Sequence, residues 1–363
     1  MLTCTCDLGA LRSNALWIGR KTDRPLIAVL KNDAYGAGSP SCALALEPYA
    51  LAFAVSSVSE ATELLRAGVR RDIMTIGPLQ SFDITRFPEN VILSIDRLPH
   101  LREIACTAPC SRIQLRLDLD GSGIGMGEAE YQEALIFLRE HRSLRLYGVF
   151  SHCPGLYRKE PSTEAARRFS SARRAARELS CDSICHLATS AALDIPSLLF
   201  DSVRSGTALF GLPSFANQKL APLRPVLSIT APLVRIFSSR EPLSLYDCCA
   251  DMNHVRRAGV VAAGYGSLPA LLQRKDITVA IRGKFAPLIG SSSMCHLVVD
   301  LSKIPEAREG DSAVFVGNSC NLAITAENFA RTCGIPACRC EGSLFSTSSA
   351  KKIYVNGCGV FLS

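Results

Sequence analysis

The chain has 363 residues, of which 48% are hydrophobic, and its formal net charge at neutral pH is +7. A chain of this length can bury a large core and exceeds the usual size of one domain, so we expect two domains. It contains no apolar run near the roughly 18 residues that span a membrane. Its start, "MLTCTCDLGAL", lacks the basic end and long apolar core of a signal peptide. We therefore expect a cytoplasmic protein with no membrane partner.

The basic residues and the cysteines both have simple interpretations. The densest basic segment, "RRFSSARRAARELS" (167–180), places arginines at helical spacing among alanines, which is typical of a solvated helix face. It lacks interleaved aromatic residues, so we predict no nucleic-acid partner. The 16 cysteines include no paired CxxC elements and no partnering histidines. They therefore indicate small buried thiols rather than a metal site.

Residues 10–212 alternate between short apolar runs and amphipathic stretches. Strands are predicted at 26–30, 51–56, 72–77, 91–95, 113–119, 146–152, 183–189 and 202–206. Helices are predicted between them, at 57–68, 128–141 and 162–180. About eight alternations in about 200 residues favour a (β/α)8 TIM-like barrel of the α/β class, with a doubly wound sheet as the alternative.

After residues 211–215 the pattern changes to strands at short spacing with turn residues between them. These strands are predicted within 223–239, 257–266, 276–290, 295–302 and 311–317. Only 322–334, "LAITAENFARTCG", has a helical pattern. The sequence therefore predicts a mostly β C-terminal domain after the barrel.

The stretch "IAVLKNDAYGAG", residues 27–38, places a lysine, Lys31, at the end of an apolar strand. In a (β/α)8 barrel the reactive groups lie at the carboxyl ends of the strands. A lysine amine there can attack an aldehyde and hold it as a Schiff base. A strand-terminal lysine is also a common surface residue, so the position alone leaves both interpretations open.

Motifs along nearly the whole chain resemble those of the alanine racemase family. "AVLKNDAYGAG" is similar to the family's cofactor-lysine signature, and the further matches follow in the family's order: "CDLGALRSN", "YGVFSHC", "CHLATSAALD", "SVRSGTALFG", "LRPVLS", "AAGYG", "GKFAPLIGSSSMCHLVVDLS" and "STSSAKKIYVNG". The resemblance implies a barrel over 10–212 that binds pyridoxal 5'-phosphate. It also implies a β-domain of 1–9 plus 213–363, a homodimer and a small amino-acid substrate.

The same resemblance implies the catalytic residues of a racemase that converts L-alanine to D-alanine in the cytoplasm for peptidoglycan precursors. Lys31 would carry the cofactor and act as one base, and Tyr265 of the second subunit would act as the other. Two bases on opposite faces are what inversion at Cα requires. Met294 would contact the substrate carboxylate through its backbone amide.

Further residues are implied as contacts of the cofactor. Arg204 would donate to the pyridine nitrogen and leave it unprotonated, because a guanidinium keeps its own proton. His152 would orient Arg204. Contacts to the phosphate are implied for Tyr35, Ser190, Gly206 and Thr207, where Gly206 suits a close backbone approach.

The sequence departs from the family pattern near the substrate carboxylate. The arginine of the family motif falls at Gly123, and the lysine that is carbamylated in many members falls at Arg116, one candidate for the missing positive charge. Cys295 stands where an aspartate is usual. We therefore predict weak alanine turnover or a different amino acid, because a charge-assisted contact is lost.

Three alternatives remain open at this point. The first is a racemase for another amino acid such as serine, and the second is a divergent cofactor-binding protein with little turnover. The third, a basic amino-acid decarboxylase of related fold, is disfavoured by Arg204 and by the absence of a Gly-Gly-Gly run.

Overall fold

The computed structural model describes residues 1–79, 88–158, 160–215, 222–238, 255, 257–272, 276–335 and 350–356, and the backbone of 243–245, 248–250 and 360–362. The chain forms two compact units. One, here called the barrel unit, comprises Arg12–Ala34 and Ser39–Leu209. The other, the β unit, comprises Met1–Leu11, Tyr35–Gly38 and Phe210–Ser363.

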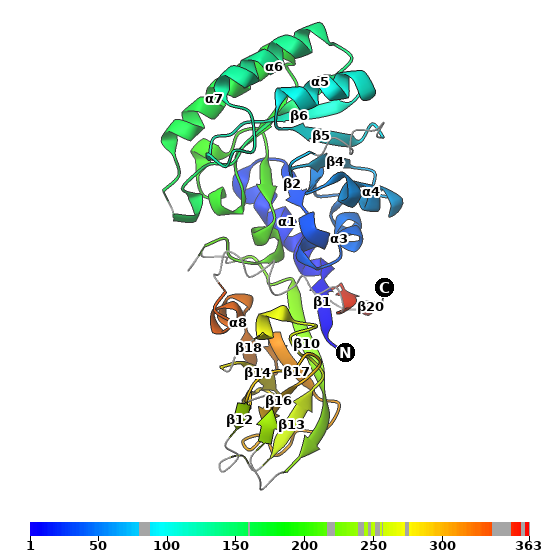
Figure 1. The fold of residues 1–363 in the computed structure, drawn as a ribbon, viewed down its shortest axis with the longest axis vertical. Coiled ribbons are helices and arrows are strands. Elements are labelled where there is room, and N and C mark those ends of the chain that lie inside the picture. Colours follow the sequence, from blue (N-terminus) through cyan, green and yellow to red (C-terminus); the bar gives the residue numbers. More distant parts are fainter. Residues whose placement is uncertain are drawn as a thin grey trace. The chain divides into compact units, whose positions relative to one another are not determined.

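Eight parallel strands form the barrel unit in the order β8-β7-β6-β5-β4-β3-β2-β9 (Figure 1). They are β2 (Leu26–Val29), β3 (Ala52–Val55), β4 (Asp72–Thr75), β5 (Val91–Ile95), β6 (Arg112–Arg116), β7 (Arg145–Phe150), β8 (Ile184–His186) and β9 (Val203–Ser205). Strands β2 to β8 pair in consecutive order, and β9 pairs with β2. The predicted TIM-like barrel is therefore confirmed, and the doubly wound alternative is wrong.

The sheet is nearly closed between its two end strands, β8 and β9. The Asp201 N–H donates to the Cys185 carbonyl at 3.0 Å, and the Arg204 N–H donates to the Ala188 carbonyl at 3.1 Å. These bonds tie the start of β9 to β8 and the segment that follows it. They bring the carboxyl ends of β8 and β9 to the same edge of the barrel. Barrel enzymes carry their reactive groups at this edge.

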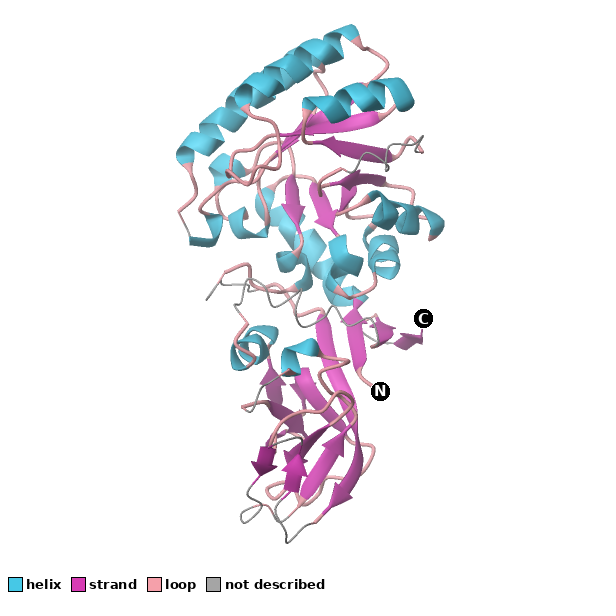
Figure 2. Ribbon diagram, in the orientation of Figure 1, coloured by secondary structure: helices cyan, strands magenta, loops and turns pink. Residues whose placement is uncertain are grey.

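Helices surround these strands (Figures 1 and 2). They are α1 (Leu8–Thr22), α3 (Ser39–Leu46), α4 (Val58–Arg66), α5 (Leu98–Thr107), α6 (Glu128–Glu140) and α7 (Thr163–Leu179), with short turns α2 (Lys31–Tyr35), η2 (Leu156–Arg158), η3 (Ser190–Ala192), η4 (Pro196–Leu198) and η5 (Thr207–Phe210). Helix α7 shows why the amphipathic ones form. Ser162 caps its first turn, and Ala165, Phe169, Ala172 and Ala176 make a buried stripe at helical spacing.

The β unit is mostly sheet (Figure 2). Its strands are β1 (Thr3–Asp7), β10 (Leu227–Phe237), β11 (Leu243–Leu245), β12 (Cys248–Ala250), β13 (Ala258–Val261), β14 (Thr278–Ile281), β15 (Lys284–Pro287), β16 (Leu297–Asp300), β17 (Ser312–Ser319), β18 (Leu322–Ile324), β19 (Lys351–Val355) and β20 (Val360–Leu362), with η6 (Pro269–Leu271) and α8 (Ala326–Thr332). The N-terminal β1 lies between β10 and β19 in the main sheet. The predicted mostly β C-terminal domain is therefore confirmed.

The structure also bears on the expectations about membrane-spanning segments and about the cysteines. Among the described residues, no helix combines the length and apolar character needed to cross a membrane. The interpretation of the cysteines is only partly right, because Cys106, Cys110, Cys181, Cys295 and Cys320 are exposed while Cys4, Cys6, Cys42, Cys153, Cys185 and Cys333 are buried. Cys338 and Cys340 lie outside the described residues.

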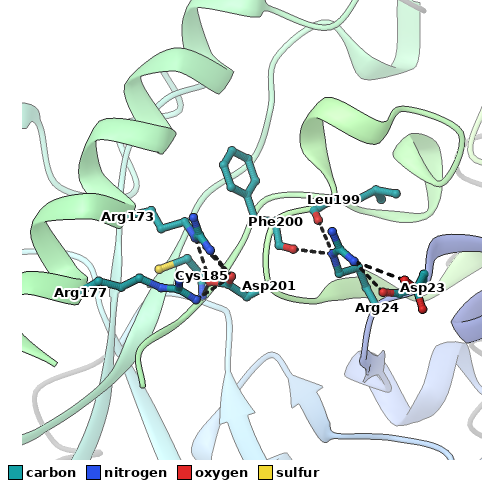
Figure 3. A network of polar contacts seen from close by, with 8 residues as sticks. All are labelled: Asp23, Arg24, Arg173, Arg177, Cys185, Leu199, Phe200 and Asp201. Atoms are coloured by element: carbon teal, nitrogen blue, oxygen red, sulfur yellow. Dashed lines mark hydrogen bonds and ion pairs between the residues drawn. The ribbon is translucent and has the colours of Figure 1, made fainter. Parts of the chain in front are cut away.

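An aspartate fastens α7 to the strands (Figure 3). Asp201 accepts hydrogen bonds from Arg173 at 2.6 Å, from Arg177 at 2.9 Å and from the Cys185 N–H at 2.9 Å. Burial alone would raise the pKa of Asp201, but these hydrogen bonds and the two positive charges lower it below its ordinary value. Part of the predicted solvated arginine face thus has a structural function.

The variant Asp201→Asn should lower the free energy of unfolding by about 1–3 kcal/mol, because charge-assisted bonds to a half-buried carboxylate are lost. Urea denaturation at neutral pH measures this. Because the pKa of Asp201 is lower in the folded state than in the unfolded state, its stabilising contribution is present at pH values above the unfolded-state pKa. The contribution disappears as the pH falls through the folded-state pKa. Glu164→Gln, which breaks an exposed pair on the same helix, should leave stability unchanged. Equal stability of the two variants would contradict this role of Asp201.

Candidate active site

Lys31 stands at the carboxyl end of β2, and an unusual turn follows it. Residues Asn32, Asp33, Ala34 and Tyr35 all have positive φ angles, between 52° and 58°. They form one turn of left-handed helix, closed by the Ala34 N–H donating to the Leu30 carbonyl at 2.8 Å. Each non-glycine residue in this conformation costs on the order of 1 kcal/mol. Strain of this kind persists only where surrounding contacts enforce it, and it clusters at functional sites.

Glu60 on α4 supplies the contacts that hold the turn. One carboxylate oxygen accepts from the Asn32 N–H at 2.8 Å, and the other accepts from the N–H and the hydroxyl of Ser56 at 2.7 and 2.8 Å. The Asp33 carboxylate accepts from the Ser39 N–H at 2.8 Å on the far side of the turn. Glu60 therefore fixes the backbone directly after Lys31 to the end of β3.

Arg204 on β9 is buried, with 2% of its surface exposed. Its terminal nitrogens donate to His186 Nδ1 at 2.6 Å and to the carbonyls of His186 and Ser151 at 2.7 Å. Among the described residues, the imidazole that bonds Arg204 is that of His186 on β8, which the sequence analysis did not name, and the orienting function of His152 stays a prediction. Within the part of the chain that the structure describes, no hydrogen bond uses Arg204 Nε.

The contact with Arg204 fixes the protonation of His186. A guanidinium can only donate, so His186 Nδ1 accepts and the imidazole hydrogen lies on Nε2. Nε2 then donates to Gln114 Oε1 at 3.1 Å, and Gln114 donates in turn to the Thr75 carbonyl and to Ser94 Oγ. Burial, with the charge of Arg204, lowers the pKa of His186 well below its ordinary value. The result is a neutral, fully hydrogen-bonded chain across the barrel interior.

The carboxyl ends of the barrel strands carry several basic groups. Burial lowers the pKa of His152 to about 3, helped by the charges of Arg204, Arg116 and Lys31, so this imidazole is neutral at physiological pH. Burial and the charge of Arg116 also lower the pKa of Arg204, to about 9. Within the described parts of the chain, no carboxylate forms a salt bridge with Lys31, Arg116 or Arg204. Such an arrangement favours an anionic ligand.

Ser190 and the segment after β9 form a second part of this edge. Ser190 Oγ accepts from the Gly206 N–H at 3.0 Å and from the Ala208 N–H at 3.2 Å, and it bonds to Ser205 Oγ at 3.1 Å. Thr207 lies between these donors, at the start of η5. Converging backbone N–H groups with a buried hydroxyl suit the oxygens of a phosphate. The structure thus brings Ser190, Gly206 and Thr207 together, and their contact with a phosphate stays a prediction.

The remaining predicted residues belong to the β unit. Tyr35 ends the left-handed turn and packs edge-on against Phe210, with ring centroids 5.4 Å apart. The Tyr265 N–H donates to the Ser293 carbonyl at 3.0 Å, and the Gly266 N–H donates to the Met294 carbonyl at 3.0 Å. Tyr265 and Met294 therefore lie on two loops joined by backbone bonds. A Cβ at Gly264 would meet the Ser293 carbonyl oxygen at 2.2 Å, so only glycine permits this approach.

The structure also places the residues that depart from the family pattern. Gly123 lies in an exposed turn with φ of +73°, a conformation that disfavours a side chain such as arginine. Its N–H donates to the Asp118 carboxylate at 3.0 Å. Cys295 is exposed, next to Met294, and its N–H donates to Ser293 Oγ at 3.2 Å. Because residue 123 is glycine, this position supplies no positive charge to the site.

Sequence reasoning missed His186 and Glu60. His186 stands in the quoted segment "CHLATSAALD" and is the last residue of β8, so its place at a strand end in a recognised motif was an available signal. Glu60 follows Ser57 by three residues, a spacing typical of a helix N-terminus. Because a helix-capping function explains that spacing, no separate signal in the sequence indicated the hydrogen bond between Glu60 and the Asn32 N–H.

The fold is a (β/α)8 barrel with an attached mostly β domain, and Lys31, Arg116 and Arg204 lie at the carboxyl ends of barrel strands, where enzymes of this architecture carry their reactive groups. Residues 6–214 match the family model for the alanine racemase N-terminal domain, and residues 227–340 match that for the alanine racemase C-terminal domain. The chain belongs to the alanine racemase family.

Relatives and solved structures agree with this placement. Alanine racemase from Syntrophobacter fumaroxidans is 30% identical over 90% of this chain and 91% of its own length, and that from Pseudomonas entomophila is 32% identical over 84% and 87%. The crystal structure of the biosynthetic alanine racemase from Pseudomonas aeruginosa superposes with a TM-score of 0.81 at 26% identity. The superposition covers 98% of this chain and 99% of that one.

Replacing Glu60 should expose the strain in the lysine turn. Glu60→Ala removes three hydrogen bonds to a carboxylate and should lower the free energy of unfolding by about 1–3 kcal/mol. Glu60→Gln keeps one acceptor oxygen and should lie between Glu60→Ala and the wild type. Chemical denaturation measures both. Glu63→Ala, an exposed glutamate on the same helix, is the matched control, and a Glu60→Ala effect no larger than that control would rule out the role of Glu60.

Proposed function

We propose that the protein is a pyridoxal-phosphate-dependent amino-acid racemase that interconverts L-alanine and D-alanine. The observation that carries the proposal is Lys31, held at the end of β2 by a strained turn that Glu60 fastens. Arg204 and Arg116 form no salt bridge with described residues. Both lower the pKa of His152, and Arg116 lowers that of Arg204, which places their charges at the same barrel edge. Membership of the alanine racemase family supports the choice of reaction.

The residues of the barrel unit fit the chemistry of this cofactor, an aldehyde that carries a phosphate. The Lys31 amine would bind the aldehyde carbon. Ser190 with the N–H groups of Gly206 and Thr207 would hold the phosphate, since converging N–H donors match its oxygens. Arg204 Nε, which no described residue engages, would donate to the pyridine nitrogen. Tyr35 and His152 stay predicted contacts.

When bound, pyridoxal phosphate supplies an electron-withdrawing ring that acidifies the Cα–H bond of an attached amino acid. Arg204 can only donate, so it holds the ring nitrogen as an acceptor and limits that withdrawal. The chain must then supply two bases, because inversion takes a proton from one face of Cα and returns one to the other. We assign these functions to Lys31 Nζ and to Tyr265 Oη of a second subunit.

Residues near the substrate carboxylate bear on which amino acid is converted. Met294 would contact its carboxylate through the backbone amide, on the loop joined to that of Tyr265. The alternative function is a racemase for another amino acid, such as serine, or a cofactor-binding protein with little turnover, and two observations support keeping it as the second candidate. Gly123 carries no side chain in an exposed turn, and Cys295 offers a thiol where the family has a carboxylate. The homodimer, the cytoplasmic location and the supply of D-alanine to peptidoglycan also stay predictions.

Solvent-exchange measurements test the reaction directly. In deuterium oxide, the wild-type protein loaded with pyridoxal phosphate should convert each enantiomer of its substrate to the other and place deuterium at Cα. Lys31→Ala should abolish exchange. Tyr265→Phe should suppress conversion by about 100-fold or more, the usual contribution of one acid–base group. A panel of L- and D-amino acids, read by chiral chromatography and mass spectrometry, identifies the substrate.

Tyr49→Phe is the matched control, because Tyr49 lies at the end of a helix and has no assigned function. It should racemise at the wild-type rate. Wild-type protein that exchanges no amino acid in the panel would contradict the proposed function. Unchanged exchange in Tyr265→Phe would contradict the two-base assignment alone.

A further inference from the structure

Arg116 is a buried guanidinium whose hydrogen bonds are incomplete. It ends β6 and is 7% exposed. Its only described hydrogen bond is a long one, 3.3 Å from Nη1 to the Ile76 carbonyl, and its Nε is buried without an acceptor among the described residues. Leaving a buried charged donor without a partner is costly, so such a group calls for an explanation, and a ligand that completes its hydrogen bonds is one.

Arg116 faces the same barrel edge as the lysine site. Its guanidinium lies 5.8 Å from the centre of the Phe150 ring, and that of Arg204 lies 5.5 Å from the same ring. The charge of Arg116 lowers the pKa of both Arg204 and His152. Two arginines and a neutral imidazole therefore share one low-dielectric region, in which neither arginine forms a salt bridge with a described carboxylate.

Three carboxylates act on Arg116 at longer range, and each already has other partners. Asp96 accepts from His100 at 2.9 Å. Asp118 and Asp120 accept from backbone N–H groups of the glycine-rich turn that follows β6. None of the three accepts a hydrogen bond from Arg116, and burial lowers the pKa of Arg116 despite them. The guanidinium therefore stays available to an external anion.

We propose that Arg116 binds the carboxylate of the amino-acid substrate. The planar fork of a guanidinium matches the two oxygens of a carboxylate, and a buried ligand carboxylate would complete its unmet hydrogen bonds. In the assignment above, Lys31, Ser190 and Arg204 engage the cofactor, which leaves Arg116 as the unassigned buried cation of this edge. That the carboxylate is the substrate's rests on the proposed function; that Arg116 binds carboxylates does not.

Cofactor-free protein with acetate as the probe tests the binding site without catalysis. Acetate should raise the melting temperature of the wild-type protein in a saturable way, and acetamide, its neutral analogue, should not. Arg116→Gln should need roughly ten- to hundredfold more acetate for the same shift, the loss expected for charge-assisted hydrogen bonds. Arg112→Gln is the matched control: it breaks an arginine–aspartate pair on the same strand, so it should lower the starting melting temperature and keep the wild-type response to acetate.

Arg116→Lys keeps a buried cation and covers the case in which Arg116→Gln does not fold. It should bind acetate more weakly than the wild type, because an ammonium lacks the planar fork. An acetate response in the folded Arg116 variants equal to that of the wild type would overturn the proposal.

The loaded enzyme supplies a second readout. Arg116→Gln should raise the KM for the amino acid roughly ten- to hundredfold and change kcat less. Its retention of the cofactor should equal that of the wild type. A large loss of kcat with unchanged KM would overturn the proposal. If acetate binding depends on Arg116 but the protein racemises no amino acid, the carboxylate site is supported and the proposed function is rejected.

Discussion

The hydrogen bond between Arg204 and His186, 2.6 Å from Nη1 to Nδ1, determines the chemistry of the barrel edge. Because a guanidinium only donates, the imidazole must accept and stays neutral, and its other nitrogen extends the bonding to Gln114 on β6. The positive charge on β9 is thereby held by an imidazole and carbonyl oxygens instead of a carboxylate. A carboxylate at this position would neutralise Arg204 and remove the attraction for an anionic ligand.

The barrel edge is costly to maintain in two respects. Arg116 and Arg204 are buried near each other against one phenylalanine ring, and like charges in a low-dielectric region repel. The turn after Lys31 holds four non-glycine residues in a left-handed conformation. Surrounding contacts, such as those of Glu60, offset the second cost. Asp96, Asp118 and Asp120 act on Arg116 from longer range, and an anionic ligand would offset the first cost further, so binding would stabilise this unit.

Much of this architecture is predictable from the sequence, because parallel strands buried on both faces are continuous apolar runs. Strand β5, Val91–Ile95, matches its predicted range at both ends. Helix α3, "SPSCALAL", was missed because its apolar residues show no amphipathic period. The contact of His186 with Gln114 joins residues 72 apart and depends on strand order, which motifs do not encode. The left-handed turn was missed because Ala34 and Tyr35 disfavour it locally and tertiary contacts impose it.

The central claim is that this edge positions Lys31 to bind the aldehyde of pyridoxal phosphate covalently. Borohydride reduction of the loaded protein, followed by proteolysis and peptide mass spectrometry, tests it most directly, because reduction makes the bond between nitrogen and carbon permanent. The account predicts a pyridoxyl-phosphate adduct on the peptide that contains Lys31 and on no other lysine. An adduct on a different lysine, or none after reduction of protein saturated with the cofactor, would contradict it.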